Sequence, residues 1–512
     1  MEKTSSPPLV LEEWQRLAPM SLLFLIVGGS LKFIKENLFM FAGAGAGFAF
    51  LDRLGLREFL LIGGAALLIA VLGAIIIYRR CRFRVEEHAL RVRRGLFETK
   101  DLRVRFARVQ NVELKQPLYF RPFGLIRFQL ETPGAESTEV ELPGIREDLA
   151  LALRDRIAGY GGAGAGTEQA ATDSMDEPGA SPAGSEAGSI VHAPTARRLF
   201  MHGLVSNQVW VIAGVLAWLF GTLEERATEL IARLGIDSVL ERFSDTGWAG
   251  LLVLALGLIG LLFLLSGTIA WLRYQGFLLH RQGDRLVSVA GLAERREQSV
   301  RSEKLTGLSL YQTALGRLLG QRYLVVRQAK SGAIDADGAR AQFLIPGLTG
   351  HDQDIVSAIM PGAGLPRSLE PVSRRFVYFY ATRIGAAVLA FSGVIWLLAP
   401  QAVDYFLAAL LGLPLVFLLV YLRWRCWGWR IDGELCWVQR GLLGRRQDVF
   451  AMPLVQQVRV MQTPYLRRHG LGTVRLTLPQ GDHDIPMLPM AQAADLANRA
   501  LHAAETALVH RV

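Results

Sequence analysis

The sequence predicts a membrane protein of α-helical plus β structure. In this fold, six transmembrane helices occur in three pairs, and each pair precedes a small antiparallel β-barrel with a C-terminal helix. Three observations predict it. The chain of 512 residues is 51% hydrophobic and only 20% charged, long apolar stretches recur in pairs, and the segments that follow the pairs repeat one pattern of glycines and glutamines. A soluble chain of this size rarely has such a composition, and disorder, collagen and a coiled-coil rod are excluded as the main architecture.

The predicted spans are apolar stretches of about 20 residues, the length that crosses the hydrocarbon core as a helix. Four stretches meet this criterion: Phe59 to Tyr78, Trp248 to Leu272, Phe376 to Leu398 and Val403 to Leu422. Two weaker ones, Leu38 to Leu51 and Val209 to Leu223, complete the three pairs. Residues 21–36 either extend the first span as a kinked helix or lie along the membrane surface, and we favour the surface position. No removable signal peptide is expected, because no basic region precedes a cleavage site.

The basic flanks predict the orientation of the spans. Arginines directly follow the second span of each pair, for example Arg79, Arg80 and Arg273, whereas the loops inside the pairs are neutral or acidic. By the positive-inside rule, both termini and the three long segments after the pairs are expected in the cytoplasm.

The three long segments share a framework at matched offsets, which indicates an internal repeat. Each begins with a glycine followed by leucine, carries a glutamine 21 residues later and a second glycine 29 residues after the first. These framework residues are Gly95, Gln116 and Gly124 in the first copy, Gly291, Gln312 and Gly320 in the second, and Gly441, Gln462 and Gly470 in the third.

Hydrophobic alternation in each copy predicts short, half-buried strands. Runs such as Ala89 to Arg93 and Leu125 to Leu130 alternate, and equivalent runs recur in the other copies. Each copy ends in a helical stretch, at Arg146 to Ile157, His351 to Met360 and Ala491 to Leu508. Several strands and one helix in about 70 residues describe a curled antiparallel barrel with a helix over one end.

The order of these motifs resembles the bacterial pleckstrin-homology-domain (PH) membrane proteins of the YdbS/YdbT type. The motifs are Gly95-Leu96, Gln110-Asn111-Val112, Gln116-Pro117, Phe123-Gly124-Leu125 and Leu142-Pro143-Gly144. Three membrane pairs, each with a domain, correspond to the three-domain, YdbT-like arrangement. The resemblance implies a PH-like barrel for each copy and a bacterial cytoplasmic membrane location. The later copies depart from the pattern, since Thr313 and Thr463 replace the proline.

The expected domain organisation follows from the repeats and the composition of the linkers. Residues 161–189 are rich in small and acidic residues, which is typical of a flexible tether. The expected segments are 1–78 (interfacial helix and first pair), 79–160 (PH-like domain 1), 161–197 (linker), 198–272 (second pair), 273–362 (PH-like domain 2), 363–375 (linker), 376–422 (third pair) and 423–512 (PH-like domain 3).

No catalytic or cofactor motif stands out in the sequence. No nucleophile elbow, phosphate-binding loop or zinc-protease motif occurs, and no histidine pairs with a cysteine at metal spacing. We therefore expect no enzyme activity, no cofactor and no bound metal. Arg383 is the one ionisable candidate within a span, and it is expected to extend toward the head groups.

The charge distribution suggests what the domains contact. Residues 79–160, 273–368 and 423–512 each have five more Lys and Arg than Asp and Glu, although the membrane flanks supply much of the excess in the first. The densest basic run alternates at strand spacing and could bind phospholipid or an acidic partner, or could be a solvated face. It comprises Arg93, Arg94, Lys100, Arg103, Arg105 and Arg108.

Two functions fit these features. In the first, the PH-like domains form a non-enzymatic scaffold that binds protein partners, such as a smaller single-domain relative, or membrane lipids at the inner leaflet. The resemblance implies a role in envelope maintenance or in resistance to membrane-active agents. The alternative is a transporter or lipid-handling protein that uses the six helices as a pathway. Nucleic-acid binding is not expected, because the basic residues flank membrane segments.

Overall fold

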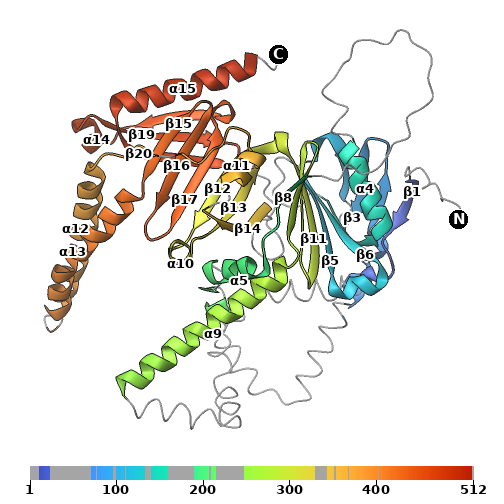
Figure 1. The fold of residues 1–512 in the computed structure, drawn as a ribbon, viewed down its shortest axis with the longest axis horizontal. Helices are drawn as coiled ribbons and strands as arrows, with labels where there is room; N and C mark the ends of the chain where they lie inside the picture. The colour runs from blue at the N-terminus through green and yellow to red at the C-terminus, as the bar shows by residue number, and fades with distance from the viewer. Residues whose placement is uncertain are drawn as a thin grey trace. The chain divides into compact units, whose positions relative to one another are not determined.

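The structure is a computed structural model of the whole chain. It describes residues 11–22, 68, 71–76, 78–95, 100–109, 111–132, 140–159, 189–206, 209–210, 212–214, 247–328, 343–350, 353–366, 368–399, 401 and 403–509. Figure 1 shows these residues as coloured ribbon.

Each repeat contains six strands in two groups of three, which we call its first and second sheets. In repeat 1 the first sheet comprises β2 (Arg82–Val85), β3 (Ala89–Arg94) and β4 (Lys100–Arg105). The second sheet comprises β5 (Asn111–Pro117), β6 (Leu125–Glu131) and β7 (Val140–Arg146), and α4 (Glu147–Gly159) follows. The short helix η2 (Leu118–Phe123) connects β5 to β6.

Repeats 2 and 3 follow the same plan, so the predicted internal repeat is confirmed. Repeat 2 contains β9 (Leu278–Gln282), β10 (Arg285–Ala290), β11 (Glu294–Arg301), β12 (Leu305–Gln312), α10 (Ala314–Leu318), β13 (Gln321–Gln328), β14 (Phe343–Thr349) and α11 (Gln353–Ile359). Repeat 3 contains β15 (Gly428–Asp432), β16 (Leu435–Gly441), β17 (Arg445–Ala451), β18 (Gln457–Met461), α14 (Pro464–Arg468), β19 (Leu471–Leu478), β20 (Gly481–Pro489) and α15 (Met490–Val509).

An additional strand, or in repeat 3 an isolated bridge, precedes the predicted membrane pair of each repeat. β1 (Leu11–Arg16) pairs with β2 through Gln15 and Phe83, and β8 (Ser189–His192) pairs with β9 through His192 and Leu279. Glu370 forms an isolated bridge with Trp429 of β15 at the equivalent place. The predicted spans therefore lie between the first strand and the second strand of each sheet. β8 falls within residues 161–197 and Glu370 within 363–375, the two stretches that the sequence suggests are linkers.

The sheets continue from one repeat into the next. The second sheet of repeat 1 joins the first sheet of repeat 2 in the order β7-β6-β5-β11-β10-β9-β8. The second sheet of repeat 2 joins the first sheet of repeat 3 in the order β14-β13-β12-β17-β16-β15. The sheets at the two ends of the series are shorter, namely β1-β2-β3-β4 and β18-β19-β20.

This sheet order differs from the separate closed barrels that the sequence predicts. In the described residues, no hydrogen-bonded ladder links the first sheet of a repeat to its own second sheet. The physical reason is that β11 and β17 already use their free edges to pair with the preceding repeat. The PH-like β-sheet domains are present, but in the part of the chain that the structure describes no ladder of hydrogen bonds closes one of them as a barrel.

In repeats 1 and 3, hydrophobic packing holds the two sheets together instead. In repeat 1 one core includes Phe83 of β2, Phe128 of β6 and Leu153 of α4, all buried. In repeat 3 an equivalent core includes Phe450 of β17, Val474 of β19 and Leu496 of α15. The three predicted C-terminal helices are confirmed, and α4 and α15 each supply an apolar stripe to the core of their repeat.

The chain divides into two compact units, and the boundary falls inside repeat 2, between Arg301 and Ser302. The first sheet of repeat 2 belongs to the unit with repeat 1, and its second sheet belongs to the unit with repeat 3. Residues 197–206, which include most of α5 (Ala196–Val205), belong to the second unit, where the Thr313 hydroxyl donates to the Val205 carbonyl at 2.8 Å.

Three described helices are long and apolar enough to cross a membrane: α9 (Trp248–Tyr274), α12 (Arg375–Leu398) and α13 (Val403–Arg425). α12 and α13 run side by side (Figure 1), with the Trp396 ring 5.5 Å from that of Phe406. The Arg383 guanidinium lies 4.2 Å from the centre of the Phe379 ring.

The remaining predicted spans lie mostly or wholly outside the described residues. These are Leu38 to Leu51, most of Phe59 to Tyr78 and most of Val209 to Leu223, and the surface helix expected over 21–36 lies largely outside as well. The structure therefore supports a membrane protein with three candidate spans.

Candidate functional site

The cross-repeat strand pairs, which we call joints, are the features that the structure repeats most closely. Joint 1 pairs β5 with β11, and joint 2 pairs β12 with β17, both antiparallel. In joint 1, Glu113 lies opposite Gln298; in joint 2, Ser309 lies opposite Asp448. The framework offsets make Ser309 equivalent to Glu113 and Asp448 equivalent to Gln298. The two joints therefore have the same register.

Joint 1 buries a carboxylate on its second-sheet strand. Glu113 is 1% exposed and accepts a hydrogen bond from the Gln298 side chain at 3.0 Å. The Lys115 Nζ lies 3.0 Å from one Glu113 oxygen, and the Arg296 Nε lies 3.2 Å from the other. This pairing compensates the cost of removing the charge from water.

Helix α4 adds further contacts to joint 1. Arg154 of α4 forms an ion pair with Glu297 of β11. Arg301 of β11 and Arg285 of β10 donate to the last carbonyls of α4, both to Ile157, at 3.3 and 3.1 Å. A helix C-terminus carries partial negative charge, so two cations here are favourable. Burial, with a smaller contribution from the Arg301 charge, lowers the pKa of Arg285 to about 10.

Joint 2 buries its carboxylate on the opposite partner, the first-sheet strand. The Ser309 hydroxyl donates to Asp448 at 2.5 Å, and the Arg446 Nε donates to the same oxygen at 2.8 Å. Asp448 is 1% exposed, and the His483 ring lies 3.7 Å away. Burial lowers the pKa of His483, and the arginines near it act in the same direction, whereas Asp448 opposes them.

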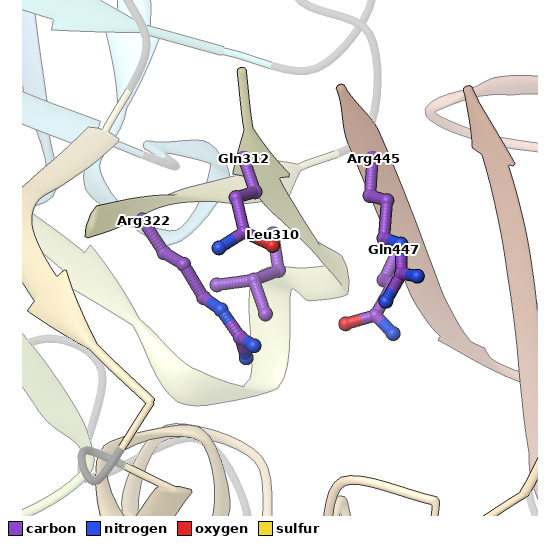
Figure 2. Close-up of a pocket in the computed structure, with 5 residues that line it drawn as sticks. All are labelled: Leu310, Gln312, Arg322, Arg445 and Gln447. Carbon is purple, nitrogen blue, oxygen red and sulfur yellow. The ribbon is translucent and has the colours of Figure 1, made fainter. Parts of the chain in front are cut away.

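Both joints contain a pocket built from equivalent positions. In joint 1 a pocket of about 150 Å³ includes Leu114, Gln116, Ile126, Arg295 and Glu297 in its lining. In joint 2 a pocket of about 20 Å³ is lined by the five equivalent residues, Leu310, Gln312, Arg322, Arg445 and Gln447. Figure 2 shows these five side chains converging from β12, β13 and β17. Joint 1 has Ile126 at the place that Arg322 occupies in joint 2, and residues of α4 complete the lining of the larger pocket.

Gln116 and Gln312 line these pockets, and all three framework glutamines donate hydrogen bonds to neighbouring residues. Gln116 donates to Glu147 at 3.3 Å, Gln312 donates to the Gly316 carbonyl at 3.5 Å, and Gln462 donates to the Leu471 carbonyl at 2.8 Å. The threonines that replace proline have a clear structural role. Thr313 and Thr463 cap the short helices α10 and α14, whereas Pro117 precedes η2 without a side-chain cap.

The framework glycines occupy turns that a side chain would disturb. Gly124, Gly320 and Gly470 have φ values of 59°, 66° and 64°, the left-handed region that glycine adopts without strain. At Gly291 and Gly441 an added Cβ would meet a backbone oxygen at 2.0 Å, and Gly95 has a φ of 149°. These glycines support the turns between strands.

The candidate basic residues are divided between two faces of the first sheet. Arg93, Arg103 and Arg105 lie on the same, outward-facing side of the sheet and are exposed. Arg94 of β3 and Lys100 of β4 lie opposite each other in the strand register and alternate with these three residues. Their side chains lie outside the described part of the structure. Arg108 is exposed in η1 (Phe106–Arg108).

The outward face also contains residues that the sequence did not suggest. Trp14 of β1 stacks with three arginines, whose guanidinium carbons lie within 6 Å of its ring centre: Arg84, Arg91 and Arg93. We call Trp14, Arg84, Arg91, Arg93, Arg103 and Arg105 the Trp14–arginine face. β1 is far from β2 in the sequence, so the basic run alone could not reveal it.

Two carboxylates offset much of the charge on the Trp14–arginine face. Asp101 accepts hydrogen bonds from Arg91 and Arg93, and these bonds lower its pKa to about 2. Glu86 accepts from Arg84 and Arg103, and the Arg84 bond in particular lowers its pKa. Arg105 forms no ion pair with any other described residue. The face is therefore cationic but partly neutralised.

The described residues contain no group of three or more His, Cys, Asp or Glu placed to hold a metal ion. Cys81, Cys426 and Cys436 are buried free thiols, and burial raises the pKa of Cys436 to about 12. Such a thiol is protonated and unreactive at neutral pH.

Comparison with known proteins agrees with the repeated fold. Residues 38–160, 208–347 and 379–504 each match the bacterial PH domain family. The chain is also 21% identical over 434 residues to the UPF0699 transmembrane protein YdbT of Bacillus subtilis (strain 168), covering 81% of this chain and 82% of that protein. No solved structure matches. The chain belongs to the bacterial PH domain family and is a YdbT-like membrane protein with three PH domains.

Proposed function

We propose that this protein is a non-enzymatic scaffold of the bacterial cytoplasmic membrane, whose PH-like domains bind protein partners at the inner leaflet. The positive-inside distribution of arginines supports cytoplasmic domains and termini. The resemblance to YdbT-like proteins supports a role in envelope maintenance or in resistance to membrane-active agents.

The observation that carries the proposal is the pair of joints. In both, a strand edge of one PH-like domain binds a strand of another, with the same register and a buried polar pair. Adding a strand to a sheet edge is a recurrent mode of protein recognition. The PH-like domains of this chain therefore already act as protein-binding modules toward one another.

The joints change the expected mechanism. Repeat 2 shares its two sheets with its two neighbours, so the repeats are not three independent modules on tethers. Deletion of a whole domain would leave an unpaired sheet edge in its neighbour. Point substitutions on exposed surfaces are the appropriate way to test partner binding.

The test is affinity purification of the full-length protein in mild detergent, with mass spectrometry of the retained proteins and lipids. The expected result is a near-stoichiometric membrane protein, of which a smaller single-PH-domain relative is the leading candidate. Retention of no protein would contradict the scaffold.

A second candidate function, binding of anionic lipid, is favoured by the Trp14–arginine face. A basic residue near an anionic surface contributes about 1 kcal/mol, and tryptophan is favourable at the membrane interface. Enrichment of phosphatidylglycerol without a protein partner in the same purification would favour lipid binding over the scaffold.

A further inference from the structure

Of the three equivalent strands β5, β12 and β18, β18 is the one that lacks a joint among the described residues. It is the repeat 3 equivalent of β5 and β12, and it lies at the edge of the sheet β18-β19-β20. Within the described residues, β19 pairs with one side of β18 and no strand pairs with the other. Its outer N–H and C=O groups form an edge of the kind that β11 and β17 cover in the other repeats.

Equivalent residues are much more exposed on β18 than on the two strands that form joints. Leu114 and Leu310 are 4% and 6% exposed inside their joints, whereas the equivalent Val460 is 37% exposed. All seven residues of β5 are buried, but none of the five residues of β18 is. The same position in the fold is therefore a protein interface twice and a solvent surface once.

The central residue of this edge specifies the partner. The position that holds Glu113 in joint 1 and Ser309 in joint 2 holds Arg459 in repeat 3. In both joints the residue here bonds to the residue opposite it, and one of the two is a carboxylate. Since Arg459 is a cation that forms no ion pair with any described residue, the matching residue opposite it is Asp or Glu.

The chain's own free first-sheet edge does not fit this requirement. β4 is the repeat 1 equivalent of β11 and β17 and also lies at the edge of its sheet. In the common register, Leu102 of β4 would lie opposite Arg459, and Arg103 would lie opposite Val458. This pairing supplies no carboxylate at the central position, so a second copy of the chain is a poor occupant.

We propose that the outer edge of β18 binds a first-sheet strand of a PH-like domain on a different polypeptide, with Asp or Glu opposite Arg459. The strand pairs antiparallel, in the register of joints 1 and 2. This inference rests on the proposed scaffold function and specifies where the partner binds and by which residue.

Photo-crosslinking in intact cells tests the edge directly. A photoreactive phenylalanine analogue replaces Val460 on β18, or Leu501 on α15 as a matched control that is 47% exposed in the same repeat. We expect an adduct from position 460 only, mapped by mass spectrometry to a PH-like strand that carries an acidic residue. Arg459→Asp should reduce the adduct by about tenfold or more, and reversal of the partner's acidic residue to arginine should restore it.

A gain-of-function variant tests the joint chemistry without the partner. Leu102→Asp gives β4 the carboxylate that Asp448 gives β17, so the chain gains a strand that matches its own β18. Purified Leu102→Asp protein should form concentration-dependent oligomers, and Leu102→Asn, without the charge, should not. Cysteines at positions 103 and 458 should then form an intermolecular disulfide, and cysteines at 101 and 458 should not, because only the first pair is opposite in the common register.

The outcomes separate this inference from the scaffold itself. If a protein partner is retained but position 460 gives no adduct and Arg459→Asp retains the partner equally, the edge inference is wrong and the scaffold remains. An adduct to another copy of this chain would overturn the choice of a different polypeptide. If the Leu102→Asp protein forms no oligomers, Arg459 does not select a strand with a carboxylate and only prevents unspecific pairing at an exposed edge. This result would also overturn the inference.

Discussion

The two joints have the same backbone geometry but place the buried carboxylate on opposite strands. Joint 1 has Glu113 on the second-sheet strand, and joint 2 has Asp448 on the first-sheet strand. If β5 paired with β17 instead of β11, Glu113 would lie opposite Asp448, and like charges directly opposite are destabilising. The register of a joint therefore comes from the repeated fold, whereas the choice of partner comes from charge.

The largest effect is expected from removing the carboxylate of joint 2. Asp448→Ala leaves the Ser309 hydroxyl and the Arg446 guanidinium without their buried acceptor. Breaking a buried charged pair in this way costs about 3–5 kcal/mol. We expect urea unfolding of the purified protein to show this loss in the transition of the unit that contains repeat 3.

Ser309→Ala is the control for this experiment, because it removes two hydrogen bonds, one donated to Asp448 and one accepted from Arg327, but no charge. It should cost about 1–2 kcal/mol. Equal stability of the Asp448→Ala and Ser309→Ala variants would show that the joint does not depend on its charge.

A smaller loss is expected from placing a second acid in joint 1. Gln298→Asp puts two carboxylates opposite each other, and juxtaposed like charges cost several kcal/mol when nothing compensates them. Lys115 and Arg296 contact Glu113 and compensate part of the repulsion, so we expect a loss of about 2 kcal/mol. Adding Glu113→Ser reproduces the Ser–Asp pair of joint 2 and should recover most of the stability.

A double-mutant cycle in urea measures this coupling. If the losses of the two single variants add in the double variant, the residues at positions 113 and 298 do not interact. The argument that charge selects the partner strand would then fail.

Much of the fold could be predicted from the sequence because its signals are local. The framework glycines mark turns that require a left-handed φ or a close backbone contact, and hydrophobic alternation marks the strands between them. The C-terminal helices follow from periodicity in the same way. These features depend on neighbouring residues only.

The joints could not be predicted, because the strands that they pair are far apart in the sequence. Glu113 and Gln298 are 185 positions apart, and strand edges present the same N–H and C=O groups whatever their partner. One sequence signal was available. The oppositely charged Glu113 and Lys115 are two positions apart on a predicted strand, so both lie on one face, which is typical of an ion pair that a neighbouring strand buries. β1 and β8 were missed for the same reason, since a predicted membrane pair separates each from the strand with which it pairs.

Acid should weaken joint 2 through His483. Its folded-state pKa is lowered, so the unfolded chain binds the proton first as the pH falls below about 6.5. Stability is therefore complete above that pH and decreases below it, by at most about 1.4 kcal/mol for each pH unit. Asp448, Arg440, Arg446 and Arg327 are the charged groups that act on this ring.

His483→Gln should make the unfolding free energy less dependent on pH between 7 and 5, as measured by urea unfolding at each pH. An unchanged pH slope in His483→Gln would assign the acid sensitivity to other groups.

The smallest effect is expected on the Trp14–arginine face, which contrasts with the joints because its charges are exposed. Asp101→Asn releases Arg91 and Arg93 from their carboxylate without removing a buried group. If this face contacts anionic lipid, one more unit of positive charge should raise phosphatidylglycerol binding about fivefold, the equivalent of roughly 1 kcal/mol.

Asp495→Asn changes the net charge equally in an exposed ion pair of α15 and is the matched control. Native mass spectrometry of the full-length protein, titrated with phosphatidylglycerol or phosphatidylcholine, compares the two variants. Equal gains in both would show that net charge alone attracts lipid, whereas a gain confined to Asp101→Asn would identify the Trp14–arginine face as the lipid contact and leave the sheet edges for protein partners.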